Sequence, residues 1–309
     1  MSSLNFVSGW FPSPPDDRDF QYAKSYPYGD LPTVVDLSTK FKGAPLDPLW
    51  NQGNLGSCGP QTSSADLLCV MFLLGQAPIM PSRLFTYYCT RDIMGTVNRD
   101  SGVYNRALVQ SYLKYGWCDE TLWPYDIGKY RQRPPQACYD QAAFRKIDEY
   151  VAVPQDLTVM KTAIANEDPF IFGFTVFQNF YRAASNGGLV PMPSGRVVGG
   201  HDVLIVGYDD NKELFKFRNS YSTSWGDKGY GYIPYRYALD ARYTNDFWTI
   251  VGTGLPKPTP PVPPTPPGPT PPVPVPVPVK KGKVLVDLDA MTVSRYSENS
   301  QIYQTREVD

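Results

Sequence analysis

The sequence predicts an α+β protein of two lobes, with helices in the first lobe and strands in the second. Apolar residues recur at helical spacing between residues 58 and 165. Beyond Pro169 the pattern changes to short apolar stretches bounded by Gly, Asp and Asn, which is typical of strands and turns. With 309 residues, 42% of them hydrophobic, the chain is long enough to bury a sizeable core.

Charge and composition exclude several classes of function. Lys and Arg number 29 against 30 Asp and Glu, and the net charge of −1 argues against nucleic-acid binding. No apolar run approaches the roughly 20 residues that span a bilayer, and residues 1–10 lack the basic and apolar regions of an export signal. We therefore expect no membrane span and a cytoplasmic or virion-associated location. The single histidine excludes the common multi-histidine metal sites, and no metal or cofactor is expected.

Composition divides the chain into five segments. Residues 1–32 are rich in proline and aromatic residues without periodicity, and we interpret them as an irregular arm and a candidate short pro-segment. Residues 33–150 form the predicted helical lobe, and residues 151–254 form the predicted β lobe. Fourteen prolines fall between Pro256 and Pro278, so residues 255–278 are predicted to form a polyproline II linker. Residues 279–309 form a short tail.

The linker and the tail are both candidates for partner binding. The linker is either a stiff spacer or a docking site for an aromatic groove, because PxxP patterns occur in it. In the tail, residues 283–293 alternate in part and predict one strand. A segment this small does not fold alone, so we expect it to add to another surface of this protein or of a partner.

Helices and strands are predicted in order along the body. The first helix runs from Cys58 to about Leu74, with Ser57 as its N-cap and Gly75 as its stop signal. Three further helices are predicted over residues 104–115, 139–149 and 157–165. Strands are predicted over residues 169–177, 201–210, 213–220 and 229–237.

A cysteine at the start of the first helix is the first candidate for chemistry. In the segment QGNLGSC, residues 52–58, Cys58 follows two glycines and opens the helix. A thiol there lies among unpaired N–H groups at the positive end of the helix dipole, and both features favour the thiolate. The alternative is that Cys58 is simply a small buried residue.

His201 and Asn219 are the next candidates. His201 opens the strand HDVLIVGY, and Asn219 closes the next strand after a turn at residues 209–212. By alternation Asn219 shares the apolar face of Phe215 and Phe217, where a buried amide needs a partner. We expect it to bond one imidazole nitrogen and to present the other to Cys58. Taken alone, a single histidine on a strand is more often an ordinary core or surface residue.

Together the three segments resemble the papain family of cysteine peptidases. The family pattern is Q-G-x-x-G-S-C, then H-A-V-x-x-V-G-Y, then N-S-W-G-x-x-W-G-x-x-G-Y. This chain has QGNLGSC, HDVLIVGY and NSYSTSWGDKGY in the same order, over roughly residues 30–250. The segments DSG at 100–102 and LWPYDI at 122–127 resemble its short bacterial and viral branch. The resemblance implies a papain-like fold with a helical lobe, a lobe like an antiparallel β-barrel, and an active-site cleft between them.

The resemblance also implies roles for individual residues. Cys58 matches the nucleophile, His201 the general base and acid, and Asn219 the residue that orients the imidazole. Gln52 matches the oxyanion-hole amide, acting with the backbone N–H of Cys58, and Trp225 matches the aromatic that shields the His–Asn hydrogen bond. The remaining cleft residues that it implies are Tyr221, Gly59, Ser101, Gly102 and Gly200. The implied activity is a cysteine endopeptidase that hydrolyses peptides or proteins through an acyl-enzyme, without a cofactor.

Three departures from the family pattern concern the cleft. Leu55 stands where secreted members have a disulfide cysteine, which fits a reducing compartment. Gly59 replaces the Trp after the nucleophile, and Tyr221 replaces the first Trp of the third motif, so we expect an altered wall and weaker shielding. These departures leave a second hypothesis, a weakly active or inactive papain scaffold that binds partners or assembles into a virion. A third keeps the chemistry but changes the acceptor, giving transpeptidation or deamidation.

The other cysteines and the arm complete the predictions. Cys69 lies on the apolar stripe of the first helix and is predicted to be core. Cys89, Cys118 and Cys138 are predicted to be buried thiols, with a disulfide between the last two left open. The arm is predicted to lie across the cleft and to restrain activity until it is cut or displaced. Related enzymes favour an apolar side chain two positions before the cut, but the sequence does not show the shape of the pocket.

Overall fold

The computed structural model describes residues 8–25, 27, 29–40 and 50–255, together with the backbone of three strands in the tail. The chain divides into two compact units, Met1–Pro258 and Thr259–Asp309. Apart from Leu255, the predicted linker lies outside the described residues, so both interpretations of it stay predictions. Within the described parts, no helix is long and apolar enough to cross a membrane.

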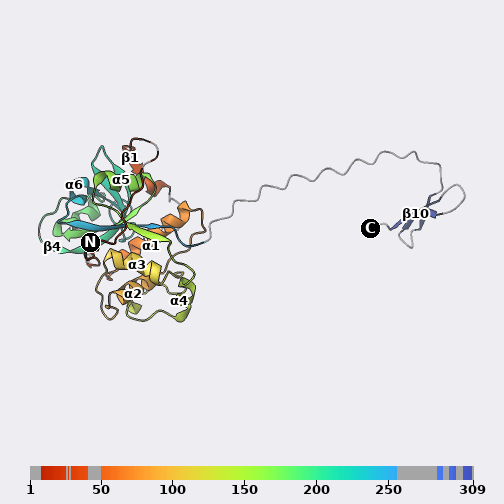
Figure 1. Ribbon diagram of the computed structural model, residues 1–309, viewed down its shortest axis with the longest axis horizontal. Coiled ribbons are helices and arrows are strands. Elements are labelled where there is room, and N and C mark those ends of the chain that lie inside the picture. The colour runs from red at the N-terminus through yellow and green to blue at the C-terminus, as the bar shows by residue number, and fades with distance from the viewer. Residues whose placement is uncertain are drawn as a thin grey trace. The chain divides into compact units, whose positions relative to one another are not determined.

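Four helices form one side of the first unit (Figure 1). They are α1 (Cys58–Leu73), α2 (Arg83–Ile93), α3 (Asn105–Lys114) and α4 (Gln136–Ala142). Two further helices, α5 (Leu157–Ala165) and α6 (Tyr235–Ala238), lie on the sheet side. Helix α1 contacts both α2 and α3 on one side and the sheet on the other, so its first residue lies where the two lobes meet.

The other side of this unit is a seven-stranded antiparallel sheet in the order β2-β7-β3-β4-β5-β6, with β1 paired to β4. The strands are β1 (Val34–Asp36), β2 (Glu149–Ala152), β3 (Phe170–Phe177), β4 (Val197–Asp209), β5 (Leu214–Arg218), β6 (Tyr230–Pro234) and β7 (Thr244–Val251). Strand β4 spans 13 residues and is paired along both edges, to β3 and then β1 on one side and to β5 on the other. Its side chains are therefore held firmly in place.

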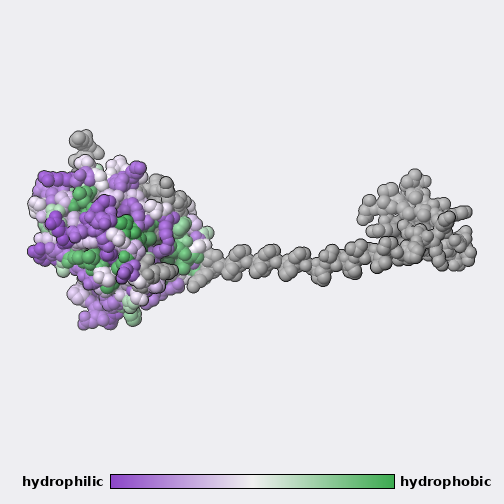
Figure 2. Space-filling model, turned by 90° about the horizontal axis from the view of Figure 1, so that it is seen from above, coloured by the Kyte–Doolittle hydropathy of each residue, from purple (hydrophilic) through white to green (hydrophobic). Residues whose placement is uncertain are grey.

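The main hydrophobic core lies between α1 and the sheet. Helix α1 is buried over nearly its whole length, and Cys69 is part of this core, as predicted. A second, smaller cluster lies in the helical lobe and contains Cys89, Cys118 and Cys138. All five cysteines are free, so the disulfide that the sequence left open is not formed. On the face seen in Figure 2, hydrophilic residues predominate and the hydrophobic ones form small patches.

Most predicted helices are found, with one error and one omission. The helices predicted over residues 58–74, 104–115 and 157–165 are α1, α3 and α5. The helix predicted over 139–149 is wrong, because α4 ends at Ala142 and the chain enters strand β2 at Glu149. The backbone between them turns to accept a hydrogen bond at Arg145 from Trp117, a contact between distant segments. Helix α2 was not predicted, although the side chain of Ser82 caps its start.

The four predicted strands correspond to β3, β4, β5 and β6. The predicted α+β papain-like fold with an antiparallel second lobe is confirmed, but the sheet does not close into a barrel, because β2 and β6 are its edge strands. Strands β1 and β2 begin before residue 151, so the sheet takes segments from both sides of the predicted lobe boundary.

The tail contains three strands where one was expected over residues 283–293. They are β8 (Val284–Asp287), β9 (Thr292–Tyr296) and β10 (Ile302–Glu307), paired antiparallel in the order β10-β9-β8. The single-strand prediction is wrong because the β-branched and aromatic pattern resumes in TVSRY and IYQTRE, beyond the stretch considered.

Candidate active site

Cys58 is the first residue of α1, and its thiol is completely buried. Three backbone N–H groups, those of Asp202, Gly59 and Cys58 itself, are directed at the sulfur and favour its thiolate. Burial acts in the opposite direction and dominates, and the neighbouring Asp202 carboxyl adds to it, so the pKa of Cys58 is raised well above its ordinary value. Burial therefore favours the neutral thiol of Cys58.

His201 and Asn219 are brought together by the pairing of β4 with β5. Asn219 Oδ1 lies 2.9 Å from His201 Nε2, and both residues are buried. The backbone N–H of Ser220 also donates to Asn219 Oδ1, at 2.8 Å, which fixes the amide with its oxygen toward the ring. The imidazole therefore carries its proton on Nε2, and Nδ1, which lies 3.4 Å from the hydroxyl oxygen of Tyr221, is the basic nitrogen of the ring.

Aromatic rings surround the imidazole and exclude water. Tyr221 stacks on His201, with ring centroids 4.8 Å apart and an interplanar angle of 14°. Phe174 and Phe180 meet the ring edge-on at 5.8 and 6.3 Å. Trp225 packs behind them, on Tyr221 and Phe180. Tyr221 is thus the aromatic that lies directly on the imidazole, while Trp225 supports it.

Burial of His201 has an electrostatic consequence. It lowers the pKa of the imidazole from 6.5 to about 4, although the hydrogen bond with Asn219 works in the opposite direction. Since burial also raises the pKa of Cys58, both members of the expected pair are neutral in this structure. A thiolate–imidazolium pair therefore forms only if water or a polar substrate replaces the groups that cover the Cys58 thiol and the His201 ring.

Gln52 is held in place by Ser220, the residue that follows Asn219. Its backbone N–H donates to Ser220 O at 2.9 Å, and its Oε1 accepts from Ser220 Oγ at 2.6 Å. The amide is thereby oriented with Nε2 as its donor end. Nε2 donates one hydrogen bond, to Leu55 O at 3.0 Å. One hydrogen of this amide remains for a second acceptor.

Two departures from the family pattern, at Gly59 and Asp202, prove to be complementary. A Cβ placed on Gly59 would lie 2.6 Å from Val103 Cγ2 and 3.1 Å from Asp202 Oδ2. The space next to Cys58 is therefore filled by Val103 and by the carboxyl of Asp202, a residue that stands where the pattern has Ala. Asp202 is fully buried, and this burial raises the pKa of its carboxyl well above the ordinary value.

Comparison with known proteins decides the family. A family model described as papain family cysteine protease matches residues 31–242. The chain belongs to the papain family of cysteine proteases. An uncharacterized peptidase C1-like protein of Acanthamoeba polyphaga mimivirus is 35% identical over 215 residues, which cover 65% of this chain and 68% of that protein. A cathepsin B-like protein of Giardia intestinalis is 29% identical over 227 residues, 70% of this chain and 68% of that one.

Among solved structures, xylellain, a cysteine protease from Xylella fastidiosa, superposes with a TM-score of 0.72 at 35% identity, covering 79% of this chain and 96% of that one. A procathepsin B of Trypanosoma congolense, at 15% identity and a TM-score of 0.64, shows only that the fold is shared. The viral and bacterial relatives confirm the papain family and its short bacterial and viral branch, which the three motifs predicted.

The N-terminal arm of this papain-family chain covers the thiol of Cys58. A Cβ placed on Gly9 would lie only 2.6 Å from Cys58 Sγ, so the backbone of Gly9 rests on the sulfur. Gly9 N–H donates to Gly200 O at 3.1 Å, and Gly9 O accepts from Val103 N–H at 2.9 Å. These two backbone hydrogen bonds join the arm to β4 in one lobe and to the segment before α3 in the other.

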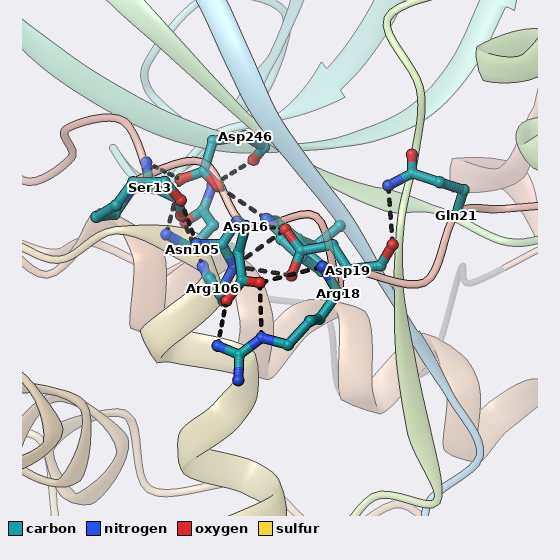
Figure 3. A network of polar contacts seen from close by, with 10 residues as sticks. Ser13, Asp16, Arg18, Asp19, Gln21, Asn105, Arg106 and Asp246 are labelled. Atoms are coloured by element: carbon teal, nitrogen blue, oxygen red, sulfur yellow. Dashed lines mark hydrogen bonds and ion pairs between the residues drawn. The ribbon is translucent and has the colours of Figure 1, made fainter.

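Farther along, the arm is anchored by charged groups (Figure 3). The Arg106 guanidinium at the start of α3 bonds both carboxylate oxygens of Asp19 and the carbonyl of Pro14. Asp246 accepts the backbone N–H groups of Ser13 and Asn105 at 3.2 and 2.8 Å, so it joins the arm to α3. These contacts hold the arm at a point several residues beyond Gly9.

The structure also places the other predicted cleft residues. Gly102 has a φ of +67° and lies against the carbonyl of Gly9, and Gly200 lies against Trp10, so both contact the arm. Ser101 turns away, and its hydroxyl bonds Thr96 Oγ1 and Gly102 O. Sequence reasoning missed Asp202 and Asp246, and the only available signal was a charge inside an otherwise apolar strand. Among the described residues, no group of His, Cys, Asp and Glu side chains is arranged to hold a metal ion.

Proposed function

We propose that this chain is a cysteine endopeptidase in which Cys58 is the nucleophile, His201 the general base and acid, and Asn219 the residue that orients the imidazole. The observation that carries the proposal is the buried 2.9 Å contact between His201 Nε2 and Asn219 Oδ1, which assigns the ring proton to Nε2 and makes Nδ1 the basic nitrogen. The position of Cys58 at the start of α1, next to the N–H of Asp202, supports the same assignment.

In this mechanism the Cys58 sulfur gives its proton to His201 Nδ1 and attacks the carbonyl carbon of the scissile peptide. The oxyanion accepts hydrogen bonds from Gln52 Nε2 and from the backbone N–H of Cys58. The C–N bond then breaks as Nδ1 returns its proton to the leaving amine, which leaves a thioester on Cys58. A water molecule, deprotonated by His201, attacks the thioester and releases the acid and the thiol.

The proposal favours catalysis over an inactive scaffold. Tyr221 stands where the third motif of the family has its first Trp. Because its ring stacks on His201, it covers the imidazole as that Trp would. Gly59 leaves no gap, because the Asp202 carboxyl and Val103 fill the space beside it. Neither departure removes an atom that the mechanism uses.

We further propose that the arm, residues 8–25, keeps the enzyme closed. Gly9 rests on the sulfur, and its carbonyl bonds Val103 N–H rather than the Gln52 amide, so the arm is not placed for attack. By excluding water it also holds Cys58 and His201 in their neutral forms. Activity then requires that the arm be displaced or cut.

The test is hydrolysis of a quenched fluorescent peptide library by the full chain carrying Gly9→Ala, with and without Cys58→Ala. The Cys58→Ala variant should lose all hydrolysis and all thioester formation, as followed by mass spectrometry. Cys69→Ala, which removes the other cysteine of α1, is the matched control and should retain activity. Hydrolysis at the parental rate without Cys58 would refute the proposal, and products that join two peptides would indicate transpeptidation instead.

A further inference from the structure

The carboxyl of Asp202 is a buried acid that the proposed mechanism does not use. Asp202 follows His201 in β4, and its side chain is fully buried. Its Oδ2 lies 3.1 Å from the place that a Cβ on Gly59 would take, in the first turn of α1. The backbone N–H of Asp202 favours the thiolate of Cys58, but its carboxyl raises the pKa of the same thiol. One residue therefore acts on the sulfur in two opposite ways.

The N–H of Asp202 is available to the sulfur because of where the strand pairing begins. At this residue β4 pairs with β3, opposite Gly173, but its pairing with β5 starts only at Leu204. The Asp202 carbonyl accepts from Thr62 Oγ1 of α1 at 3.2 Å, and Oδ1 accepts from Asn105 Nδ2 of α3 at 2.8 Å. These bonds tie residue 202 to both helices, so the side chain helps to hold the N–H on the sulfur.

The carboxyl lacks the partners that an ionised acid needs. Oδ2 is buried without a hydrogen-bond partner among the residues that the structure describes, and so is Oδ1 of Asn105. A carboxylate only accepts hydrogen bonds, so it would leave both oxygens unpaired at a high cost. A proton on Oδ2 would make this atom a donor, and Asn105 Oδ1 is an acceptor on the side chain already bonded to Asp202. In agreement, burial raises the pKa of Asp202 well above its ordinary value, although the hydrogen bond from Asn105 acts in the opposite direction.

The charges on the neighbouring elements also favour a proton on Asp202. Asn105 Nδ2 joins it to β7 by donating to Asp246 O at 2.9 Å, and the negative charge of Asp246 raises the pKa of Asp202 further. The basic residue next along α3, Arg106, bonds both carboxylate oxygens of Asp19. The arginine is therefore already engaged with another carboxylate.

Ionisation of Asp202 would act on the sulfur more than on the imidazole. Successive side chains of a strand point to opposite faces, so the carboxyl and the His201 ring lie on opposite sides of β4. The pKa of the imidazole is set by burial and by Asn219, whereas the Asp202 carboxyl acts on Cys58. A negative charge at the first turn of α1 would oppose both the thiolate and the oxyanion held by the Cys58 N–H, because each is itself negative.

We propose that Asp202 is a positioning residue that must carry a proton for the enzyme to work: the neutral acid helps to hold its own N–H on the Cys58 sulfur, and the ionised acid suppresses the thiolate. The inference rests on the proposed peptidase function and adds an upper pH limit to it. This limit comes from a residue outside the three proposed catalytic residues, at a position where the family pattern has Ala.

The experiment uses the full chain opened by Gly9→Ala, with Asp202 either intact or replaced in Asp202→Asn. Asparagine has the shape of the neutral acid and keeps an acceptor for Asn105, but it cannot ionise. The measurement is the second-order rate of Cys58 alkylation by iodoacetamide, an uncharged reagent, together with kcat/KM for one quenched peptide. Both are followed from about pH 4 to about pH 9, which brackets the reference pKa values of carboxyl and thiol groups. Asp140→Asn, which removes an exposed charge on α4, is the matched control.

The ratio of the Asp202→Asn rate to the Asp202 rate should be near one in acid and should rise about tenfold or more toward alkaline pH. This is the effect of a like charge that shifts the pKa of the thiol by about one unit. A purely structural role would give a ratio that does not change with pH. Asp246→Asn, which needs no change at Asp202, removes a charge that favours the proton, so the loss of reactivity should move to lower pH. Asp140→Asn should leave the profile unchanged.

A ratio that is the same at every pH would overturn the inference and leave the proposed function intact, as would a shift to higher pH in Asp246→Asn. The infrared difference spectrum between the Asp202 and Asp202→Asn chains at neutral pH is an independent readout. It should contain the C=O band of a protonated carboxyl, and carboxylate bands in its place would also overturn the inference. If no chain hydrolyses the peptide at any pH, the proposed function itself fails and the inference falls with it.

Discussion

Replacing Gly9 with alanine is expected to activate the enzyme without altering a catalytic residue. The new Cβ would lie 2.6 Å from Cys58 Sγ and 2.8 and 2.9 Å from the backbone carbonyl of Gly56. Two of the three neighbours are backbone atoms that cannot rotate away, so the arm has to move. Overpacking of this kind costs about 1–3 kcal/mol. At 1.36 kcal/mol per tenfold change, the displaced arm becomes about 5 to 150 times more populated.

The assay is the second-order rate of Cys58 alkylation by an epoxide, with the labelled peptide identified by mass spectrometry. The other four cysteines are buried and serve as internal references. Gly29→Asn, beyond the arm in the same N-terminal segment, is the control, because a Cβ there meets nothing within 4 Å and asparagine tolerates the positive φ. The rate should rise for Gly9→Ala in the range above and stay unchanged for Gly29→Asn. Equal rates for Gly9→Ala and the parent chain would refute the idea that the arm covers the thiol.

Three further changes test the site and the arm. In the Gly9→Ala background, Gln52→Ala should lower kcat by about 10²–10³ with little change in KM; an effect on KM alone would remove Gln52 from the oxyanion hole. Arg106→Gln deletes charged hydrogen bonds to Asp19, which are typically worth about 1.5–3 kcal/mol, so alkylation of Cys58 should become at least about tenfold faster. Arg242→Gln, which breaks the ion pair of an exposed arginine with Asp240 and its cation–π contact with Tyr243, is the control, and equal rates for the two variants would argue against this anchor. Finally, the His201 imidazole takes up a proton near pH 6.5 in the unfolded chain but only near pH 4 in the folded chain. The stability that the neutral imidazole contributes is therefore present above pH 6.5 and is lost as the pH falls toward 4. The free energy of unfolding should fall by about 3 kcal/mol over this range. The measurement is urea unfolding of the parent chain and of His201→Phe at each pH. Identical pH profiles for the two chains would contradict the burial of the imidazole.

The parts of the site that local pattern encodes could be predicted from the sequence. Cys58 follows a glycine-rich approach and opens an apolar helix, and Asn219 falls on the inner face of its strand by simple alternation. The 2.9 Å contact between Asn219 and His201 follows from a hairpin whose two strands were both predicted. Each of these inferences needed only neighbouring residues and one turn.

The rest depends on contacts between distant segments. The arm has no periodicity, and its position is decided by hydrogen bonds from Gly9 to Gly200 and Val103. Gly59 was seen as a departure, but nothing in the linear sequence connects it with Asp202, whose carboxyl fills the space beside it. In the same way, the chain leaves α4 early because Arg145 bonds Trp117, which local helix propensity does not reveal.

The titration of the single histidine tests the central claim most directly. Because the chain contains one histidine, its ring resonances in an NMR spectrum belong to His201 without further assignment. In the full parent chain the imidazole should titrate near pH 4, since the arm and the aromatic rings exclude water. In Gly9→Ala its midpoint should rise above the ordinary 6.5 as the thiolate–imidazolium pair forms, and Cys58→Ser should abolish that rise. An imidazole that titrates normally in the parent chain, or that does not respond to displacement of the arm, would contradict the account.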